Sequence, residues 1–307
     1  INIMVYDCFP FFNENDLLEL RLNQHWDFVD KFIITEASET HTGLPKPFNF
    51  DYKRFDQYKS KIIYTKIDNF DEGIRQHPEL LDNFSVHDRT GAGQNTKDWI
   101  RDHFQGNYPV KILQDIGAKD TDIIYISALD EILNEDAFKK AFYIFSDKDK
   151  LYPLRQLDRI MPHGMQSRPS VGFSLDLYVY KFNLFCQNNS VAQMTELSLL
   201  KTILPSTIRG NAISTHPSIP NAGWHFSWLD NTGGDKVLQK QKSWAHSRDI
   251  VPNNNKIKFD HNNIDEALER LFIDYKVKKI EITPETHPKY LIDNLDKYRE
   301  YISNEEA

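Results

Sequence analysis

The chain has 307 residues, 40% of them hydrophobic and 27% charged, which is the ordinary composition of a soluble globular protein with room for one large α/β domain or two modest ones. Its formal net charge of −8 argues against a general nucleic-acid-binding protein, because such proteins normally present a basic face. The two cysteines, Cys8 and Cys186, are too few for a disulfide framework or a cysteine metal cluster, and we expect both to be buried free thiols.

The first half of the chain alternates strand-like and helix-like segments. Runs rich in apolar and β-branched residues predict strands, and periodic apolar positions predict helices. Strands that alternate with helices indicate a mostly parallel sheet covered by helices on both faces. The predicted strands are 1–7, 30–38, 61–68 and 122–127, and the predicted helices are 13–26, 98–116 and 134–145.

The second half changes character. Residues 174–187 alternate apolar and polar positions and predict one long strand with two distinct faces. Short helices are predicted at 196–204 and in a segment that ends near Trp244, and an amphipathic tail at 287–302 is expected to dock on the surface. The polar stretch 251–263 is expected to be an exposed loop rather than a linker between domains.

Two adjacent acids, Asp130 and Glu131, follow the predicted strand 122–127. In an open α/β sheet, ligands bind at the carboxyl ends of the strands. Carboxylates at this edge suggest a metal-assisted reaction on a phosphorylated substrate, because Mg²⁺ or Mn²⁺ between acid and diphosphate removes the repulsion of like charges. A structural interpretation is equally open, in which Asp130 caps the helix that begins near Asn134 and Glu131 is solvated.

The sequence "GWHFSW" places two tryptophans around His225 in a predicted glycine-containing loop. His225 can complete a metal shell beside Asp130, since neutral imidazole is a common metal ligand. Trp224 or Trp228 can stack on the face of a sugar. The alternative is that both tryptophans fill the core and His225 is an ordinary buried histidine.

A loop rich in threonine, glycine and proline follows Glu36, the last acid of the predicted strand 30–38. Backbone amides and hydroxyls at Thr42 and Gly43, with the charge of Lys46, can hold a diphosphate or a sugar. An ordinary surface turn made rigid by its two prolines fits the same residues.

Several common motifs are missing. The sequence contains no Walker-type G-x-x-x-x-G-K-[ST], no G-x-G-x-x-G, no G-x-S-x-G and no H-E-x-x-H. Gly91 and Gly93 do not follow a predicted strand and indicate a loop. The residues alone therefore indicate a metal-assisted α/β enzyme that uses a nucleotide.

Five segments in this order resemble glycosyltransferase family 17, the family of the bisecting β-1,4-mannosyl-glycoprotein N-acetylglucosaminyltransferase: "DCFPFFNENDLLELRL", "EASETHTGLPKPFNF", the strand ending in "DEI", "AGWHFSW" and "HPKYLIDNLDKY". The resemblance implies a GT-A-like α/β fold over 1–307, a mostly parallel sheet flanked by helices. Its halves would be a nucleotide-sugar-binding half, 1–150, and a mixed acceptor-binding half, 151–307, with a C-terminal helix.

The resemblance also implies an activity, the inverting transfer of a sugar such as GlcNAc or another hexose from a UDP-sugar to a carbohydrate hydroxyl, assisted by Mn²⁺ or Mg²⁺. Asp130 and Glu131 match the end of the family's acidic motif, and Asp130 and His225 would bind the metal. For the general base we consider Glu196 first and Asp230 second. By position, the nucleotide-sugar site would include Asp7, Glu14, Arg21, Glu36, Thr42, Gly43 and Lys46.

The chain departs from the family pattern in places that bear on activity. The family's strand ends D-x-D-E-I-P, whereas Ala128 stands here for the first acid and Leu133 for the proline, and Gly106 stands where an arginine is expected. An active enzyme with a weakened metal site is our leading hypothesis. The alternatives are a nucleotide-sugar-binding protein silenced at Ala128, which would bind UDP-sugar without turnover, and a metal-dependent nucleotidyltransferase, which would release pyrophosphate.

Eukaryotic members of the family carry a membrane anchor. This sequence shows no run of about eighteen apolar residues and no basic leader, so we expect no membrane span. We therefore expect a cytoplasmic enzyme of a bacterium, or of a virus inside its host, whose acceptor is a cell-surface polysaccharide precursor.

Overall fold

The computed structural model describes residues 3–82, 96–146, 170–189, 191–215, 218–245, 266 and 276–304. The predicted loops at 251–263 and around Gly91 and Gly93 lie outside these residues. No helix within the described ranges is long and apolar enough to cross a lipid bilayer. Cys8 and Cys186 are buried free thiols, as predicted.

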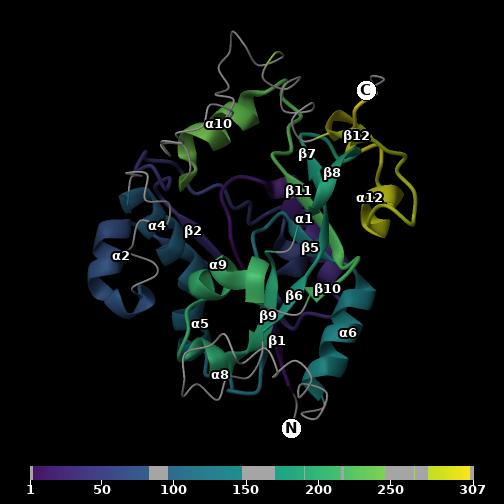
Figure 1. Cartoon of the computed structure of the whole chain (residues 1–307). Coiled ribbons are helices and arrows are strands. Elements are labelled where there is room, and N and C mark those ends of the chain that lie inside the picture. Colours follow the sequence, from purple (N-terminus) through teal and green to yellow (C-terminus); the bar gives the residue numbers. More distant parts are fainter. Residues whose placement is uncertain are drawn as a thin grey trace.

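The predicted strands of the first half form the middle of the larger sheet (Figure 1). They pair in parallel in the order β4-β1-β2-β3, and the first of them extends further than predicted, to Pro10. Two strands of the second half, β9 and β6, extend this sheet by antiparallel pairing, and β10 follows in parallel. In sheet order the bounds are β10 (Ser218–Ile219), β6 (Val171–Phe173), β9 (Gln193–Glu196), β4 (Ile123–Ile126), β1 (Val5–Pro10), β2 (Lys31–Ala37) and β3 (Ile62–Ile67).

Both faces of this sheet are buried, as the continuous apolar runs predict. In β4, Ile123 and Tyr125 pack into one hydrophobic cluster while Ile124 and Ile126 pack into another, because successive side chains of a strand point to opposite faces. Helices cover the two faces, with α2 and α4 on one side of Figure 1 and α6 on the other. The α-helices are α1 (Asn15–His25), α2 (Phe70–Gln76), α4 (Thr96–Asn107), α5 (Pro109–Asp115), α6 (Glu135–Ser146), α8 (Leu197–Leu200), α9 (Pro205–Thr215), α10 (Asp235–Ser243) and α12 (Lys289–Asp293).

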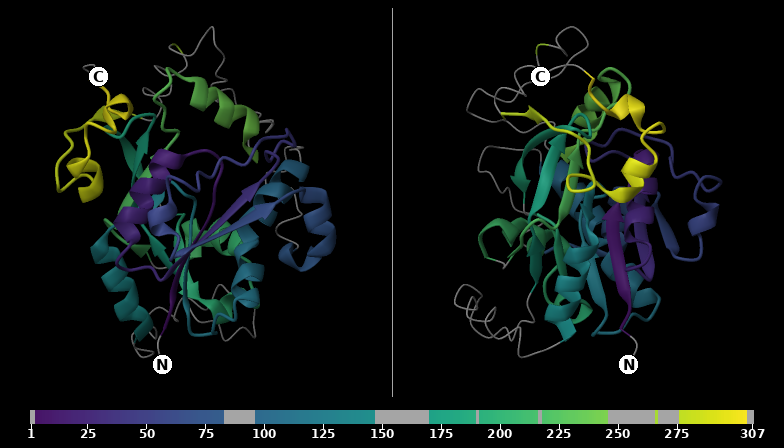
Figure 2. Two further views of the ribbon diagram at one scale, coloured as in Figure 1. Left: turned by 180° about the vertical axis from the view of Figure 1, so that it is seen from behind. Right: turned by 90° about the vertical axis from the view of Figure 1, so that its right-hand side faces the viewer.

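A second, mostly antiparallel sheet stands beside the first (Figure 2). The halves of the chain exchange strands, since β5 of the first half lies in this sheet and β6, β9 and β10 of the second half lie in the other. In sheet order its strands are β12 (Lys278–Lys279), β8 (Leu184–Asn189), β7 (Leu175–Val179), β11 (Gly223–Ser227) and β5 (Glu131–Leu133).

The structure corrects two predictions in the second half. Residues 174–187 are not one long strand, because β7 ends at Val179 and the chain reverses through Tyr180, whose φ of +68° is left-handed, before β8 runs back antiparallel. "GWHFSW" is not a loop, because Gly223–Ser227 is strand β11. Gly223 has φ +143°, and a Cβ on it would stand 2.1 Å from the carbonyl oxygen of Ile132, so this close approach of β11 to β5 requires glycine.

The tail packs against the first helix. The hydroxyl of Tyr290 donates to Glu19 Oε1 at 2.8 Å, and the hydroxyl of Tyr301 donates to Asp16 Oδ2 at 2.6 Å. Leu291 is fully buried in the main hydrophobic cluster. The tail therefore docks on the domain, as predicted, and brings Tyr301 close to the carboxyl edge of the sheet.

Candidate active site

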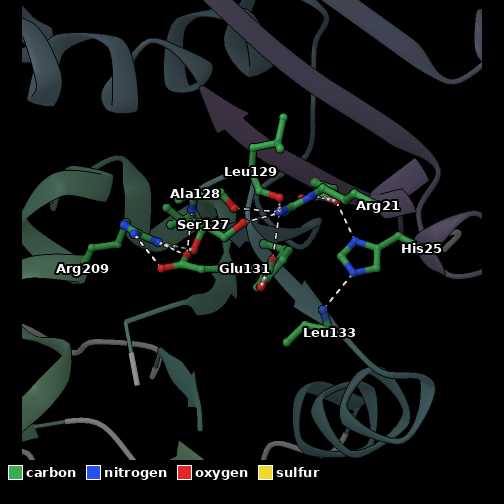
Figure 3. A network of polar contacts seen from close by, with 11 residues as sticks. Arg21, His25, Ser127, Ala128, Leu129, Glu131, Leu133 and Arg209 are labelled. Carbon is green, nitrogen blue, oxygen red and sulfur yellow. Dashed lines mark hydrogen bonds and ion pairs between the residues drawn. The ribbon is translucent and has the colours of Figure 1, made fainter. Parts of the chain in front are cut away.

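One buried arginine fixes the loop that carries the acid pair (Figure 3). Arg21, on α1, has no exposed surface, and its Nη1 donates to the carbonyl oxygens of Ala128, Leu129 and Glu131 at 2.7, 2.9 and 2.8 Å. Its Nη2 also donates to Ser127 Oγ at 2.5 Å. The guanidinium of Arg21 therefore fixes the conformation of the backbone of residues 127–131.

Asp7 on β1 holds this guanidinium in place. Its carboxylate accepts from Arg21 Nη2 at 2.5 Å and from Nε at 3.0 Å, and it accepts from His25 Nδ1 at 2.8 Å. Burial would raise the pKa of Asp7, but the charge of Arg21 and the hydrogen bond from His25 outweigh it and lower that pKa. Asp7 thus positions Arg21, which in turn positions the acid loop, residues 127–131.

The tautomer of His25 follows from its second contact. The backbone N–H of Leu133 donates to His25 Nε2 at 2.9 Å, so Nε2 carries no proton and Nδ1 donates to Asp7. Burial lowers the pKa of His25, which keeps the ring neutral. One neutral imidazole therefore contacts both the buried ion pair and the end of β5.

The two adjacent acids have opposite environments. Glu131 is buried, and its carboxylate accepts from Arg209 Nη1 at 2.6 Å, from Arg209 Nη2 at 3.0 Å and from the N–H of Ala128 at 2.7 Å. The contact with the N–H of Ala128 closes the turn that carries Asp130, and the contacts with Arg209 tie this turn to α9. Glu131 therefore fixes the loop, whereas the side chain of Asp130 stays partly exposed, at 14%.

Two adjoining cavities meet at Asp130. The sheet-edge cavity opens at the carboxyl ends of β1, β2 and β4, and the tail cavity opens towards β11 and the C-terminal tail. Four residues line both of them: Phe12, Glu14, Asp130 and Lys240. The sheet-edge cavity is further lined by Pro10, Phe11, Glu39, Thr40, His41, Lys46, Gln105, Ala128, Leu129, Ser243 and Trp244. The tail cavity is further lined by Asn13, Asp16, Leu17, Phe182, Phe226, Trp228, Leu229, Lys236 and Tyr301.

Asp130 lies between two basic side chains at this junction. Its Oδ1 is 3.5 Å from His225 Nε2 and its Oδ2 is 3.5 Å from Lys240 Nζ. Burial would raise the pKa of Asp130, but the charges of His225 and Lys240 lower it, so the carboxylate is ionised. Burial would lower the pKa of His225, but Asp130 raises it above its usual value.

These side chains can contribute to a metal site. Asp130 Oδ1 is buried without a hydrogen-bond partner among the described residues, and His225 Nε2 lies 3.5 Å from it. Two ligands that each lie about 2.1 Å from one ion stand roughly 3–4 Å apart, a range that contains the Asp130–His225 separation. No group of three or more metal-ligating side chains occurs among the described residues. An ion here would therefore take its other ligands from substrate phosphates and water, as Mg²⁺ commonly does.

The threonine-rich loop is anchored at its base by Glu36. This buried carboxylate accepts from Lys46 Nζ at 2.6 Å, from the N–H of Asn49 at 2.7 Å and from the hydroxyl of Tyr64 at 2.7 Å. Lys46 lines the sheet-edge cavity, but its charge is already paired with Glu36. Gly43 takes the left-handed φ of +84° that its turn requires.

The same loop contacts α10 from the second half. Thr42 Oγ1 donates to the carbonyl oxygen of Lys242 at 2.8 Å, and the N–H of His41 donates to that of Ser243 at 3.1 Å. Figure 1 shows α10 above the strand ends. The helix therefore closes one side of the sheet-edge cavity.

The remaining candidates of the sequence lie in different places. Trp224 is 9% exposed, packs in the core and donates from Nε1 to the carbonyl oxygen of Thr286 at 2.7 Å, whereas Trp228 lines the tail cavity. Glu196 pairs with Ile123 at the amino end of β4, so it lies at the opposite edge of the sheet from Asp130. Glu196 lines neither of the two cavities.

Asp230 also serves the fold. It accepts from the N–H groups of Thr232, Lys236 and Val237 at 2.5, 3.1 and 3.3 Å, so it satisfies first-turn N–H groups of α10, whose N-cap residue is Gly234. Glu14 is an acid that lines the tail cavity and the sheet-edge cavity as well. Its Oε2 accepts from the N–H groups of Phe12 and Asn13 at 3.2 and 3.0 Å, which fixes the carboxylate at the junction of the cavities.

Sequence reasoning missed Lys240 and Trp244. Both lie on or directly after the helix predicted behind "GWHFSW", where lysines at 236, 240 and 242 look alike. Only the packing of α10 across the cavities distinguishes Lys240 from its neighbours. The position of a lysine on a helix is a signal only when the partner of that helix face is known.

The protein has an open α/β sheet, and Asp130, His225 and Lys240 lie at the carboxyl ends of its parallel strands. Open α/β sheets bind their ligands at this end of the strands. The chain belongs to glycosyltransferase family 17, whose family model matches residues 2–303.

Curated relatives share a short part of this sequence. The chain is 32% identical over 76 residues to the beta-1,4-mannosyl-glycoprotein 4-beta-N-acetylglucosaminyltransferase of Homo sapiens and to that of Rattus norvegicus. It is 30% identical over 76 residues to the Mus musculus protein of the same name. Each match covers 24% of this chain and 14% of the relative.

Proposed function

We propose that the protein transfers a sugar from a UDP-sugar to a carbohydrate hydroxyl with inversion at the anomeric carbon. The family makes the protein a glycosyltransferase. The meeting of two cavities at Asp130 supports an inverting transfer between a donor and an acceptor. Donor and acceptor can then approach one point from two sides, as a single displacement requires.

The sheet-edge cavity is the proposed donor site. It lies at the carboxyl ends of β1, β2 and β4, where open α/β sheets bind nucleotides. Trp244 offers an aromatic face and His41 and Gln105 offer polar groups on its walls. The tail cavity, with Trp228 and Tyr301, is the proposed acceptor site, because aromatic rings suit the apolar faces of sugars.

In the proposed reaction, the acceptor hydroxyl attacks the anomeric carbon from the side opposite the diphosphate. The bond from the anomeric carbon to the diphosphate oxygen breaks, and its electron pair stays on UDP. Glu14, at the junction of the cavities, takes the proton of the hydroxyl. A divalent ion held by Asp130 and His225 would offset the charge of the leaving diphosphate when it is bound.

A second candidate is binding of the donor without turnover. Ala128 lines the sheet-edge cavity where the family pattern has an acid. Loss of that carboxylate removes a metal ligand and supports the silenced form. Because the relatives are named as N-acetylglucosaminyltransferases, UDP-GlcNAc is the first of the UDP-sugars to test.

UDP release and pyrophosphate release are measured for a panel of UDP-sugars and for UTP with a sugar phosphate, each with Mn²⁺ or EDTA, using wild type and Ala128→Asp. UDP release by wild type would support the transferase. UDP-sugar binding with turnover only in Ala128→Asp would support the silenced form. Pyrophosphate release instead of UDP release would identify a nucleotidyltransferase and contradict the proposal.

A further inference from the structure

We propose that Lys240 of α10 binds the diphosphate of the donor and offsets the charge that builds up on it as the sugar leaves. This inference rests on the proposed function. The observation behind it is the position of the ammonium group. Lys240 lines both cavities, and its Nζ stands 3.5 Å from Asp130 Oδ2.

The other cations that line these cavities have closer protein partners. Within the described part of the chain, Lys46 Nζ is 2.6 Å from Glu36 Oε1, and Lys236 Nζ is 2.7 Å from the hydroxyl of Tyr301. Among the described residues, the contacts of Lys240 Nζ are the 3.5 Å ion pair with Asp130 and the ring of Trp228, whose centroid is 5.8 Å away. A contact of that length is a weak hydrogen bond, so a diphosphate can compete for the ammonium.

Asp130 also competes poorly for Lys240, because the carboxylate of Asp130 interacts with His225 as well. The carboxylate carries one charge between two basic neighbours, whereas a diphosphate carries more than one. The side chain of Lys240 is 31% exposed, so a ligand in the sheet-edge cavity can reach it. Asp130 would position the ammonium of Lys240 before the donor binds, and the phosphates of the donor would then replace Asp130 as its partner.

The helix that presents Lys240 is fixed at both ends. Asp230 accepts from the N–H groups of Lys236 and Val237 in its first turn. Its last turn is held by the threonine-rich loop, through the hydrogen bond of Thr42 Oγ1 to the carbonyl oxygen of Lys242. A charge on a fixed helix needs little reorganisation when the diphosphate develops its charge, and such preorganised charges contribute strongly to catalysis.

Because position 128 is an alanine rather than an acid, the charge of Lys240 contributes more to binding the diphosphate than it would beside two acids. The alanine leaves the sheet-edge cavity with one carboxylate fewer near the phosphates. A fixed ammonium can then supply positive charge that a weakly held ion supplies only in part. The role of Lys240 in this proposal is electrostatic, and the hydroxyl proton goes to Glu14.

The test compares the binding of UDP and of uridine by titration calorimetry, with EDTA and with Mn²⁺, in wild type, Lys240→Ala and Lys240→Arg. Uridine lacks the diphosphate and reports on the nucleoside contacts alone. We expect Lys240→Ala to raise the Kd of UDP about tenfold or more in EDTA and to leave that of uridine within about twofold, because a charged hydrogen bond is lost. Lys240→Arg keeps the charge and should recover most of the affinity.

Lys242→Ala is the matched control. Lys242 lies on the same helix, its side chain is exposed, and alanine keeps the carbonyl that Thr42 contacts. This variant should bind UDP like wild type. Lys240→Gln serves as a second variant of similar length, and circular dichroism verifies the fold of each protein.

The turnover of the donor gives an independent result. Removal of one preorganised charge is expected to lower kcat about a hundredfold in Lys240→Ala. Unchanged UDP affinity in Lys240→Ala and Lys240→Gln, or equal weakening of UDP and uridine, would overturn the inference while leaving the transferase in place. A wild-type protein that neither binds UDP nor turns over any UDP-sugar would overturn the proposed function and this inference together.

Discussion

Arg21 on α1 and Asp7 on β1 form an ion pair in which neither side chain is exposed, with 2.5 Å between Nη2 and Oδ1. The same guanidinium holds the carbonyl oxygens of the acid loop, so the pair couples the first strand and first helix to the position of Asp130. A buried charge pair is weak evidence for stability in itself, but it is costly to break from one side. The pair is therefore a positioning device whose loss should affect both folding and chemistry.

Replacement of Arg21 should be strongly destabilising. Arg21→Met leaves Asp7 as an uncompensated buried charge and frees three loop carbonyl groups. We expect the free energy of unfolding, measured by urea denaturation, to fall by about 3–5 kcal/mol. The double variant Asp7→Asn/Arg21→Met should lose less than the sum of the two single variants, because the orphaned charge is removed. A loss below about 1 kcal/mol in Arg21→Met would show that the network does not hold the loop.

His25 should make the fold sensitive to mild acid. Burial lowers its pKa in the folded state, so between the unfolded value near 6.5 and the folded value the unfolded chain binds the extra proton. Stability is therefore complete above about pH 6.5 and falls as the pH falls. Urea denaturation at pH 7.5 and 5.5 should show a smaller fall in His25→Gln than in wild type. Equal falls in the two proteins would contradict a buried neutral His25.

The sequence predicted the strands of the first half better than the site. Runs such as 122–127 were found because continuous apolar, β-branched residues mark a strand buried on both faces. The reversal at Tyr180 was missed because a tyrosine with positive φ gives no turn signal. The different roles of Asp130 and Glu131 could not be read from adjacent letters, because Arg209, which binds Glu131, comes from a distant helix.

Glu14 should be required for the chemical step and not for donor binding. Glu14→Gln keeps an oxygen for the N–H groups of Phe12 and Asn13 but cannot accept the hydroxyl proton. We expect kcat for sugar transfer to fall by about 10²–10⁴-fold, the usual contribution of a general base, with the Kd of UDP within about twofold of wild type. Transfer at the wild-type rate would assign the base elsewhere.

Restoring an acid at position 128 should strengthen metal binding. The Ala128 methyl lines the sheet-edge cavity next to Asp130, so Ala128→Asp adds a second carboxylate there. Mn²⁺ titrated in the presence of UDP and followed by electron paramagnetic resonance should bind about tenfold more tightly to the variant, since added ligand charge raises affinity. The same Mn²⁺ affinity in both proteins would show that position 128 does not face the metal.

The central claim is that sugar transfer takes place at Asp130, where the two cavities meet. Its most direct test is the rate of UDP release from UDP-sugars by wild type and by Asp130→Asn, with Glu135→Gln, an exposed acid on α6, as the matched control. We expect UDP release by wild type and by the control, and a loss of at least about a hundredfold in Asp130→Asn at unchanged thermal stability. UDP release by Asp130→Asn at the wild-type rate would contradict it.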